Sequence, residues 1–141
     1  LVPCLPYMTN PFGDKNKKIL VHTARRSRVS YDCIINSNKL KADALQIELD
    51  GIFECDDTIA SVEVKNSEHE DFEIRQLFSA MKYFEMLKEK EEIPSTIKIR
   101  LLFMIRQRKN NNYFKIYEYA FSDKHNPNSI RLIKCKKYLI H

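Results

Sequence analysis

Apolar and polar residues alternate along two neighbouring stretches in the middle of the chain. Residues 45–54 form the first stretch and Thr58–Lys65 the second, and only Asp56 and Asp57 separate them. A period of two indicates strands that bury one face, and a two-residue connection is typical of a β-hairpin. The pattern therefore predicts an antiparallel hairpin with the two aspartates at its turn.

The hydrophobic period becomes helical directly after this hairpin. Between residues 74 and 87, apolar side chains recur three or four positions apart and form one stripe. Ser67 and Glu70 have the spacing of a capping box ahead of the stripe, and Pro94 follows it. We expect one helix over residues 68–90.

Other segments have the length and composition of strands. Three prolines occur among residues 1–16, and residues 1–30 are expected to be an irregular, basic segment apart from one short strand. The polar, Asn-rich residues 107–112 are predicted to close a second hairpin. The additional strands are expected at residues 18–22, 31–36, 96–105, 113–121 and 130–140.

These elements predict an α/β fold: a mixed β-sheet with a central hairpin and a long helix that covers one face. A chain of 141 residues suits one domain, 1–141, and because it begins with Leu1 rather than Met we expect a fragment of a longer chain. No apolar run approaches the roughly 20 residues that cross a bilayer, so no membrane association is expected. The four cysteines lack metal-ligand spacing, which favours reduced thiols and a cytoplasmic location.

The predicted hairpin brings charged side chains together on one face. Pairing outward from the two-residue turn places Asp50 opposite Glu63 and Glu48 opposite Lys65. Clustered carboxylates repel one another, but they suit a hard divalent cation. An exposed strand face with an incidental salt bridge is the alternative interpretation. On the other face, the core is expected to contain Ile47, Leu49, Val62 and Val64.

Charge is unevenly distributed around this cluster. The chain has 24 Lys and Arg against 19 Asp and Glu, a net charge of +5, yet residues 43–73 hold eleven acids and only one base, Lys65. Basic surfaces around an acidic centre fit a polyanion held over a metal, although scattered solvated charge is equally compatible. The flanking basic residues are Lys15, Lys17, Lys18, Arg25, Arg26 and Arg28; Arg106, Arg108, Lys109 and Lys115; and Arg131, Lys134, Lys136 and Lys137.

Asp50, followed on the next strand by Glu63-Val64-Lys65, resembles the motif of the PD-(D/E)XK (restriction-endonuclease-like) nuclease superfamily. The helix after the Lys strand fits that family, and residues 45–54 and 74–78 resemble segments of type II restriction endonucleases. The likeness covers residues 45–121. It departs from the family at Leu49, where a Pro often precedes the Asp, and in the absence of a predicted helix before the Asp strand.

The resemblance implies a restriction-endonuclease-like fold and a Mg²⁺-dependent DNA endonuclease, whose products carry 5′-phosphate and 3′-hydroxyl ends. It implies metal ligation by Asp50, Glu63 and the backbone carbonyl of Val64, while Glu48 is a further candidate ligand. Lys65 would orient or activate the attacking water. The same resemblance implies that Mn²⁺ substitutes and that Ca²⁺ binds without supporting cleavage.

Further predictions concern the surroundings of this site. Gln76, in the following helix, is a candidate catalytic residue by the resemblance, with a surface position as the alternative. Double-strand cleavage of double-stranded DNA implies a homodimer, or a transient dimer on DNA. A structure-specific repair or recombination nuclease and a non-catalytic DNA-binding module remain alternatives to a type II restriction endonuclease or its cleavage domain. The predicted DNA contacts are Arg25, Arg26, Arg28, Arg106, Arg108 and Lys109.

Overall fold

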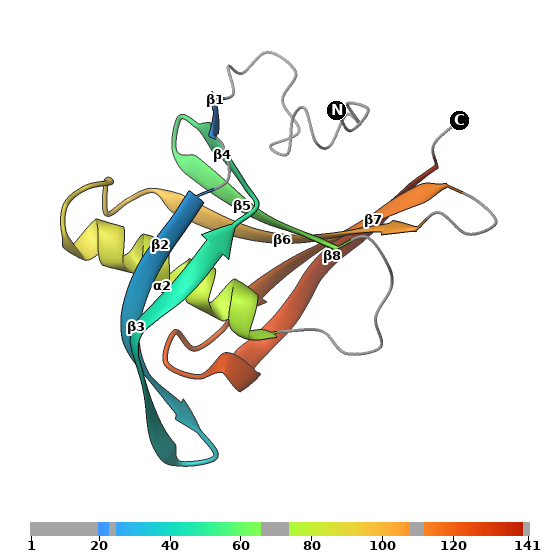
Figure 1. The fold of residues 1–141 in the computed structure, drawn as a ribbon. Coiled ribbons are helices and arrows are strands. Elements are labelled where there is room, and N and C mark those ends of the chain that lie inside the picture. The colour runs from blue at the N-terminus through green and yellow to red at the C-terminus, as the bar shows by residue number, and fades with distance from the viewer. Residues whose placement is uncertain (1–19, 23–24, 66–73, 108–111, 140–141) are drawn as a thin grey trace.

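The computed structural model describes residues 20–22, 25–65, 74–107 and 112–139 of the chain. These residues form a mixed α/β fold that consists mostly of strands, with a six-stranded sheet, a two-stranded sheet and, within the described ranges, one α-helix (Figure 1). Among the same residues, no helix has the length and apolar character needed to cross a membrane. The predicted α/β class and the mixed sheet are thereby confirmed.

The larger sheet carries the predicted central hairpin. Among the described strands, β5 and β6 form its only parallel pair, whereas its other neighbouring strands are antiparallel. A parallel pair needs a long crossover, and helix α2 (Ile74–Glu89) lies in that connection. The strand order is β1 (Leu20–His22), β4 (Gly51–Cys55), β5 (Thr58–Lys65), β6 (Lys98–Gln107), β7 (Tyr113–Phe121) and β8 (Ile130–Leu139), with a short 3₁₀ helix, η1 (Pro127–Ser129), before β8.

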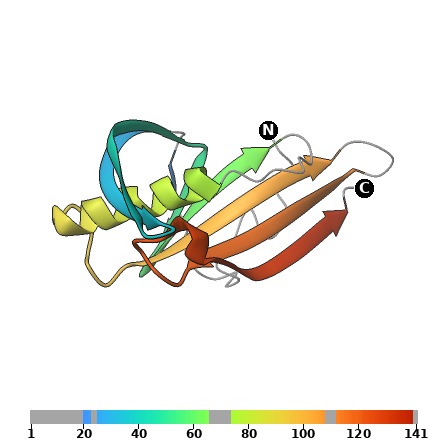
Figure 2. The same cartoon turned by 90° about the horizontal axis from the view of Figure 1, so that it is seen from below.

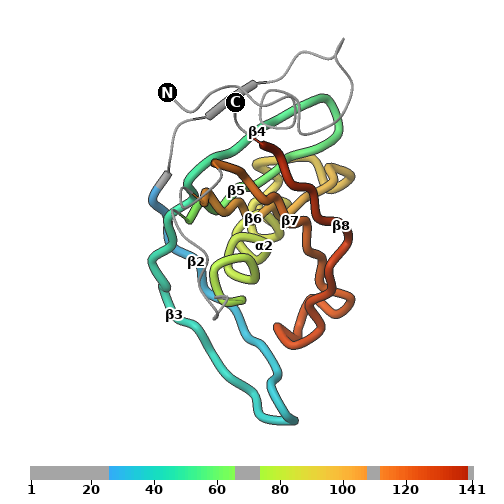
Figure 3. The backbone as a smooth tube through the Cα atoms, turned by 90° about the vertical axis from the view of Figure 1, so that its right-hand side faces the viewer, coloured from blue at the N-terminus to red at the C-terminus, as the bar shows by residue number. Residues whose placement is uncertain are grey.

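The smaller sheet is a ribbon of two long antiparallel strands, β2 (Arg25–Ile35) and β3 (Asn38–Leu49). Helix α2 lies between this ribbon and the six-stranded sheet (Figures 2 and 3). All three layers contribute to one core, which explains why the apolar side chains of the helix are so thoroughly buried. Core residues include Val29 and Ile47 from the ribbon, Leu77, Phe78 and Phe84 from the helix, and Ile59, Leu101 and Phe103 from the sheet.

A second core covers the opposite face of the six-stranded sheet. Because side chains alternate along a strand, β5 and β6 have apolar residues on both faces, as expected for a buried parallel pair. The buried members of this second core are Ala60, Val62, Leu102, Met104, Phe114 and Ile116. The alternate side chains of β5, among them Ile59, Glu63 and Lys65, therefore point to the face that carries the helix.

The predicted hairpin is confirmed in its turn and register. Cys55 pairs with Thr58 across the two aspartates, and the ladder continues to Gly51 opposite Val62. Asp56 has a positive φ of 36°, which fits the left-handed backbone of tight hairpin turns.

Beyond this ladder the prediction is wrong, because the chain turns at Asp50 and β3 pairs with β2 instead. Ile47 and Leu49 consequently pack in the core on the helix side. Val62 and Val64 face the opposite core, so the four residues do not share a face as expected.

The β2–β3 ribbon was also missed in part. Residues 25–30 are strand rather than irregular, and strand β3 begins at Asn38 rather than at residue 45. Residues 38–41 of β3 are exposed on both faces, so burial imposes no hydrophobic alternation on this part of the ribbon. The predicted helix end is confirmed at Glu89, whereas Ser67, Glu70 and the predicted start lie outside the described residues.

Candidate active site

The kink between β3 and β4 positions the first carboxylate. Asp50 lies between these strands, and its Oδ2 accepts a hydrogen bond of 2.9 Å from the backbone N–H of Val64 on β5. The bond joins the kink to the end of the hairpin ladder, so Asp50 is held beside β5 although the regular pairing stops at Gly51. The predicted proximity of Asp50 and Glu63 is thereby explained by a side-chain bond rather than by strand pairing.

Among the described carboxyl groups of this pocket, Glu63 has the largest pKa shift. Only 12% of its side chain is exposed. Burial raises the pKa of Glu63 from 4.5 to about 7, and repulsion from Asp50 contributes in the same direction. The nearby charge of Lys65 opposes the rise without cancelling it. At neutral pH, a substantial fraction of Glu63 is therefore protonated in the cation-free protein.

Lys65 lies two residues further along β5, on the same face as Glu63. Its Nζ is 3.6 Å from Glu63 Oε1, which is an ion pair but too long for a strong hydrogen bond. One third of the lysine side chain is exposed. The ammonium group can therefore reach a ligand in the site as well as the carboxylate.

Helix α2 forms one wall of the site, on the side away from the sheet. A pocket of about 360 Å³ is lined by Asp50, Glu63, Lys65 and Gln76, together with residues of β3; we call it the acidic pocket. The Oε1 atom of Gln76 is buried and has no hydrogen-bond partner among the described residues. A buried acceptor without a partner is costly, so this atom indicates a group that the pocket is built to receive.

Two further residues of the pocket were missed at the sequence level. Arg75 is exposed on the first turn of α2 and Ser79 is buried one turn later, and both line the acidic pocket. The Ser79 hydroxyl bonds the Tyr31 hydroxyl at 2.9 Å, which ties the helix to the ribbon. A polar Ser within an apolar helical stripe was the signal that could have identified this position.

Glu48 is not where the hairpin prediction put it. Its carboxylate pairs with Arg26 across the ribbon at 2.6 Å, and 58% of its side chain is exposed. The expected position opposite Lys65 is wrong, because β3 has left the sheet at this point. Glu48 instead lies on the rim of the acidic pocket, where metal ligation by its side chain stays a prediction.

The six predicted DNA contacts do not form one surface. Arg26 and Arg28 are exposed on β2. Arg106 lies on the opposite face of the sheet, with its guanidinium carbon 5.7 Å from the Phe114 ring centroid and its Nε buried without a partner in the described part of the chain. The structure thus does not group Arg106 with the ribbon arginines. Outside the described residues or side chains lie Arg25, Arg108 and Lys109.

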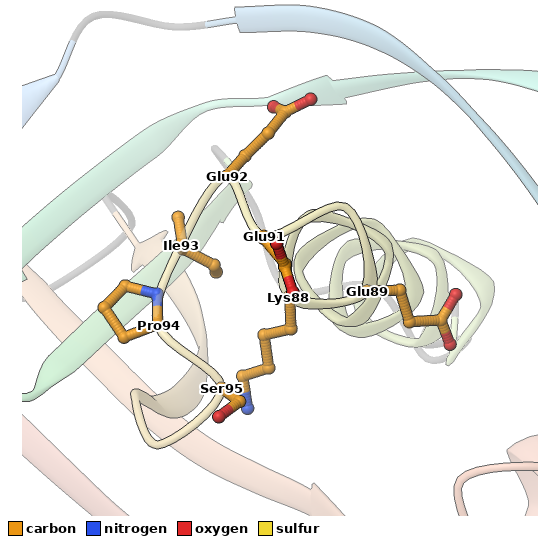
Figure 4. Close-up of a pocket in the computed structure, with 7 residues that line it drawn as sticks. All are labelled: Lys88, Glu89, Glu91, Glu92, Ile93, Pro94 and Ser95. Atoms are coloured by element: carbon orange, nitrogen blue, oxygen red, sulfur yellow. The ribbon is translucent and has the colours of Figure 1, made fainter.

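A second pocket lies at the other end of α2 and is slightly larger, at about 410 Å³. Its side chains do not converge: in Figure 4 the carboxylates of Glu89 and Glu92 point away from Lys88 and Ser95. The acidic pocket is smaller but brings two carboxylates, an ammonium group and an orphaned amide together. Chemistry therefore favours the acidic pocket as the functional site.

The donor set of the acidic pocket suits a hard cation. Within the described ranges, no three His, Cys, Asp or Glu side chains form a metal-binding group. The pocket does combine two carboxylates with the buried amide oxygen of Gln76. Oxygen donors of this kind, completed by water or phosphate, are those that Mg²⁺ accepts.

Comparison with known sequences and structures gives one match. A family described as "Domain of unknown function (DUF6997)" matches residues 6–139. No curated protein and no solved structure matches the chain.

Proposed function

The chain belongs to the DUF6997 family, and we propose that it is a divalent-cation-dependent phosphodiesterase that cuts DNA. The observation that carries the proposal is the acidic pocket itself. A carboxyl with a pKa near 7, a second carboxylate, a lysine and an orphaned amide oxygen converge there from three elements. Groups placed this way destabilise the free protein, which is typical of sites that act on a ligand.

The order of elements supports a nuclease of the PD-(D/E)XK type. Asp50 immediately precedes the β4–β5 hairpin, and Glu63-Val64-Lys65 ends its second strand. Helix α2 is the next described element, and β6 returns parallel to β5. The resemblance to PD-(D/E)XK nucleases implies this order of strands and helix around Asp50 and Glu63-Val64-Lys65. A restriction-endonuclease-like fold is therefore part of the proposal, and so is activity on double-stranded DNA as a homodimer or transient dimer.

The residues of the pocket have separable roles. The proton of the attacking water would pass to solvent, and Glu63 would bind the cation as a carboxylate, because a positive charge lowers its raised pKa. Lys65 lies beside Glu63 and orients the nucleophile while its positive charge stabilises the phosphorane-like transition state. Arg75, exposed at the mouth of the pocket, binds a phosphate oxygen and so positions the diester.

Asp50, Glu63, Gln76 and the backbone carbonyl of Val64 would hold Mg²⁺ in this pocket. When bound, the cation would supply Lewis-acid stabilisation of the negative charge that develops on the phosphate. The fit rests on the orphaned Gln76 oxygen and on the elevated pKa of Glu63, because both are relieved by a positive ligand. Mn²⁺ should substitute, and Ca²⁺ should bind without supporting cleavage.

Incubation with supercoiled plasmid and Mg²⁺ tests the proposal. We expect cleavage by the wild type and a loss of more than 100-fold in Glu63→Ala. Discrete fragments support a type II restriction endonuclease or its cleavage domain, and nicks confined to branched or damaged DNA support a repair nuclease. If the wild type leaves all these substrates intact, or if Glu63→Ala retains activity within about tenfold, a barrier change of about 1.4 kcal/mol, the proposed site is wrong.

A further inference from the structure

A row of lysines crosses the sheet on the face that carries the acidic pocket. The strand register places Lys65 opposite Ile105, Ile105 opposite Lys115, and Lys115 opposite Lys137. Directly opposed residues project from the same face of a sheet. With strands about 4.8 Å apart, the row runs roughly 14 Å from the pocket to the edge strand β8.

Helix α2 does not cover this end of the sheet. Figure 2 shows that the strands extend well past the helix, on the side where β6 ends and β7 begins. Lys137 is exposed and Lys115 is half-buried. The outer part of the row therefore lies on the surface, at the same end of the sheet as Lys65.

Tyr113 holds the two outer lysines in place. Lys137 Nζ lies 4.1 Å from the centroid of its ring, and Lys115 Nζ lies 5.5 Å from it. Cation–π contacts of this kind reduce the number of side-chain conformations and keep the ammonium groups near the sheet. They also bring two positive charges to one ring, an arrangement that an anion between them would stabilise.

We infer that the outer part of this row, Lys115 and Lys137 with Tyr113 beside them, is a docking surface for the phosphate backbone of DNA. The docked strand is the one that enters the acidic pocket. The inference rests on the proposed function, since that function supplies the substrate. Charge complementarity supports this occupant: two carboxylates at one end of the row repel a polyanion, so binding energy must come from positive charge beside them. Contacts to phosphates carry no sequence information, so the row positions DNA rather than selecting a sequence.

The other face of β8 offers a matched control. Lys136 pairs with Ile116 and Arg131 pairs with Ala120, so both project from the face opposite to the acidic pocket. Both are exposed. A double reversal there changes the net charge by the same amount, on the same edge strand, without altering the row.

Binding of a fluorescent DNA duplex in Ca²⁺, measured by anisotropy, tests the inference. Lys115→Glu/Lys137→Glu should weaken binding at least tenfold more than Arg131→Glu/Lys136→Glu. The slope of log Kd against log salt should fall by about two, one for each lysine that no longer neutralises a phosphate. Lys115→Gln/Lys137→Gln should lie in between, which guards against a variant that folds poorly.

Equal weakening by the two double reversals, or no weakening by either, would overturn the inference. The binding assay is independent of cleavage, so the two proposals fail in different ways. Wild type that binds DNA through the row but never cuts plasmid contradicts the proposed hydrolysis. If the wild type cuts plasmid but Lys115→Glu/Lys137→Glu binds DNA normally, the row is not the docking surface.

Discussion

Two glutamates of the six-stranded sheet are buried to the same extent, on opposite faces. Glu118 on β7 exposes 11% of its side chain and Glu63 on β5 exposes 12%. Burial alone would raise the pKa of both carboxyls. Their environments nevertheless send the two pKa values in opposite directions.

Glu118 has a partner that matches it. Arg100 donates hydrogen bonds of 2.7 and 2.9 Å to its two oxygens, and Lys134 lies 3.9 Å away. Burial pushes the pKa of Glu118 upward, but the hydrogen bonds and charge of Arg100 outweigh it and the pKa falls below 4.5. The pair is a bidentate, self-sufficient unit of the fold.

Glu63 has no such match. Asp50 adds a like charge, and Lys65 at 3.6 Å offsets it only in part, so the pKa rises to about 7. A buried carboxylate is therefore structural when its hydrogen bonds and its charge are matched within the protein, as those of Glu118 are. A buried carboxylate whose charge is not matched within the protein, such as Glu63, indicates a site that binds a ligand.

The largest effect is expected at Lys65. Lys65→Met removes the positive charge beside the reacting phosphate, and cleavage should fall about 1000-fold, or about 4 kcal/mol in the barrier. Lys98→Met is the matched control, because Lys98 lies on the same sheet in an exposed pair with Asp57 and its loss should change cleavage less than twofold. The measurement is the rate of plasmid cleavage. If Lys65→Met cleaves within tenfold of the wild-type rate, Lys65 does not stabilise the reacting phosphate.

Glu63→Gln should stabilise the metal-free protein at high pH. A raised folded pKa means that protonation favours the native state, so the destabilisation is absent below about pH 4.5. It grows as the pH rises toward 7 and is constant above that value. At pH 8 the gain should reach at most about 3 kcal/mol, and at pH 4 it should vanish. Urea unfolding in chelator measures both; an unchanged or lower stability at pH 8 would mean that Glu63 is a structural residue.

Glu118→Gln should destabilise the protein, whereas Glu63→Gln should stabilise it. The substitution leaves Arg100 with an incomplete partner, and the free energy of unfolding at pH 7 should fall by about 2 kcal/mol. Because the folded pKa of Glu118 is depressed, its contribution is present above the unfolded value and is lost as the pH falls through the folded one. Stability that is equal to wild type at pH 7 would contradict the assigned role.

A smaller effect is expected at Gln76. Gln76→Leu removes the orphaned amide oxygen, so cleavage should fall about tenfold, or about 1.4 kcal/mol. The melting temperature should hold or rise, since the substitution eliminates a buried acceptor that has no partner among the described residues. Lower stability with unchanged cleavage would show that the amide serves the fold.

The sequence predicted the hairpin because turn and alternation agree locally. Cys55 opposite Thr58 follows from two aspartates between apolar strands, and the helical stripe is equally clear. Gln76 was found by the resemblance alone. Its orphaned oxygen depends on packing between three layers, which no local pattern encodes.

The kink at Asp50 was beyond prediction for a physical reason. Residues 45–54 read as one alternating run, and periodicity cannot say that a chain changes partner in the middle of such a run. Glu48 was therefore placed beside Lys65, whereas it pairs with Arg26 in the ribbon. The Tyr113, Lys115 and Lys137 cluster is likewise a product of cross-strand register between segments far apart in sequence.

Thermal melts with and without Ca²⁺ test most directly whether Asp50 and Glu63 form a cation site. Asp50→Asn keeps an acceptor for the Val64 N–H but removes the charge that repels Glu63. In chelator it should therefore melt above the wild type. Ca²⁺ at about 100 times its Kd should stabilise the wild type by about 2.7 kcal/mol, or roughly 8 °C, and should raise Asp50→Asn by less than a third of that. If Asp50→Asn melts lower in chelator, or gains as much from Ca²⁺ as the wild type, the cation site is not there.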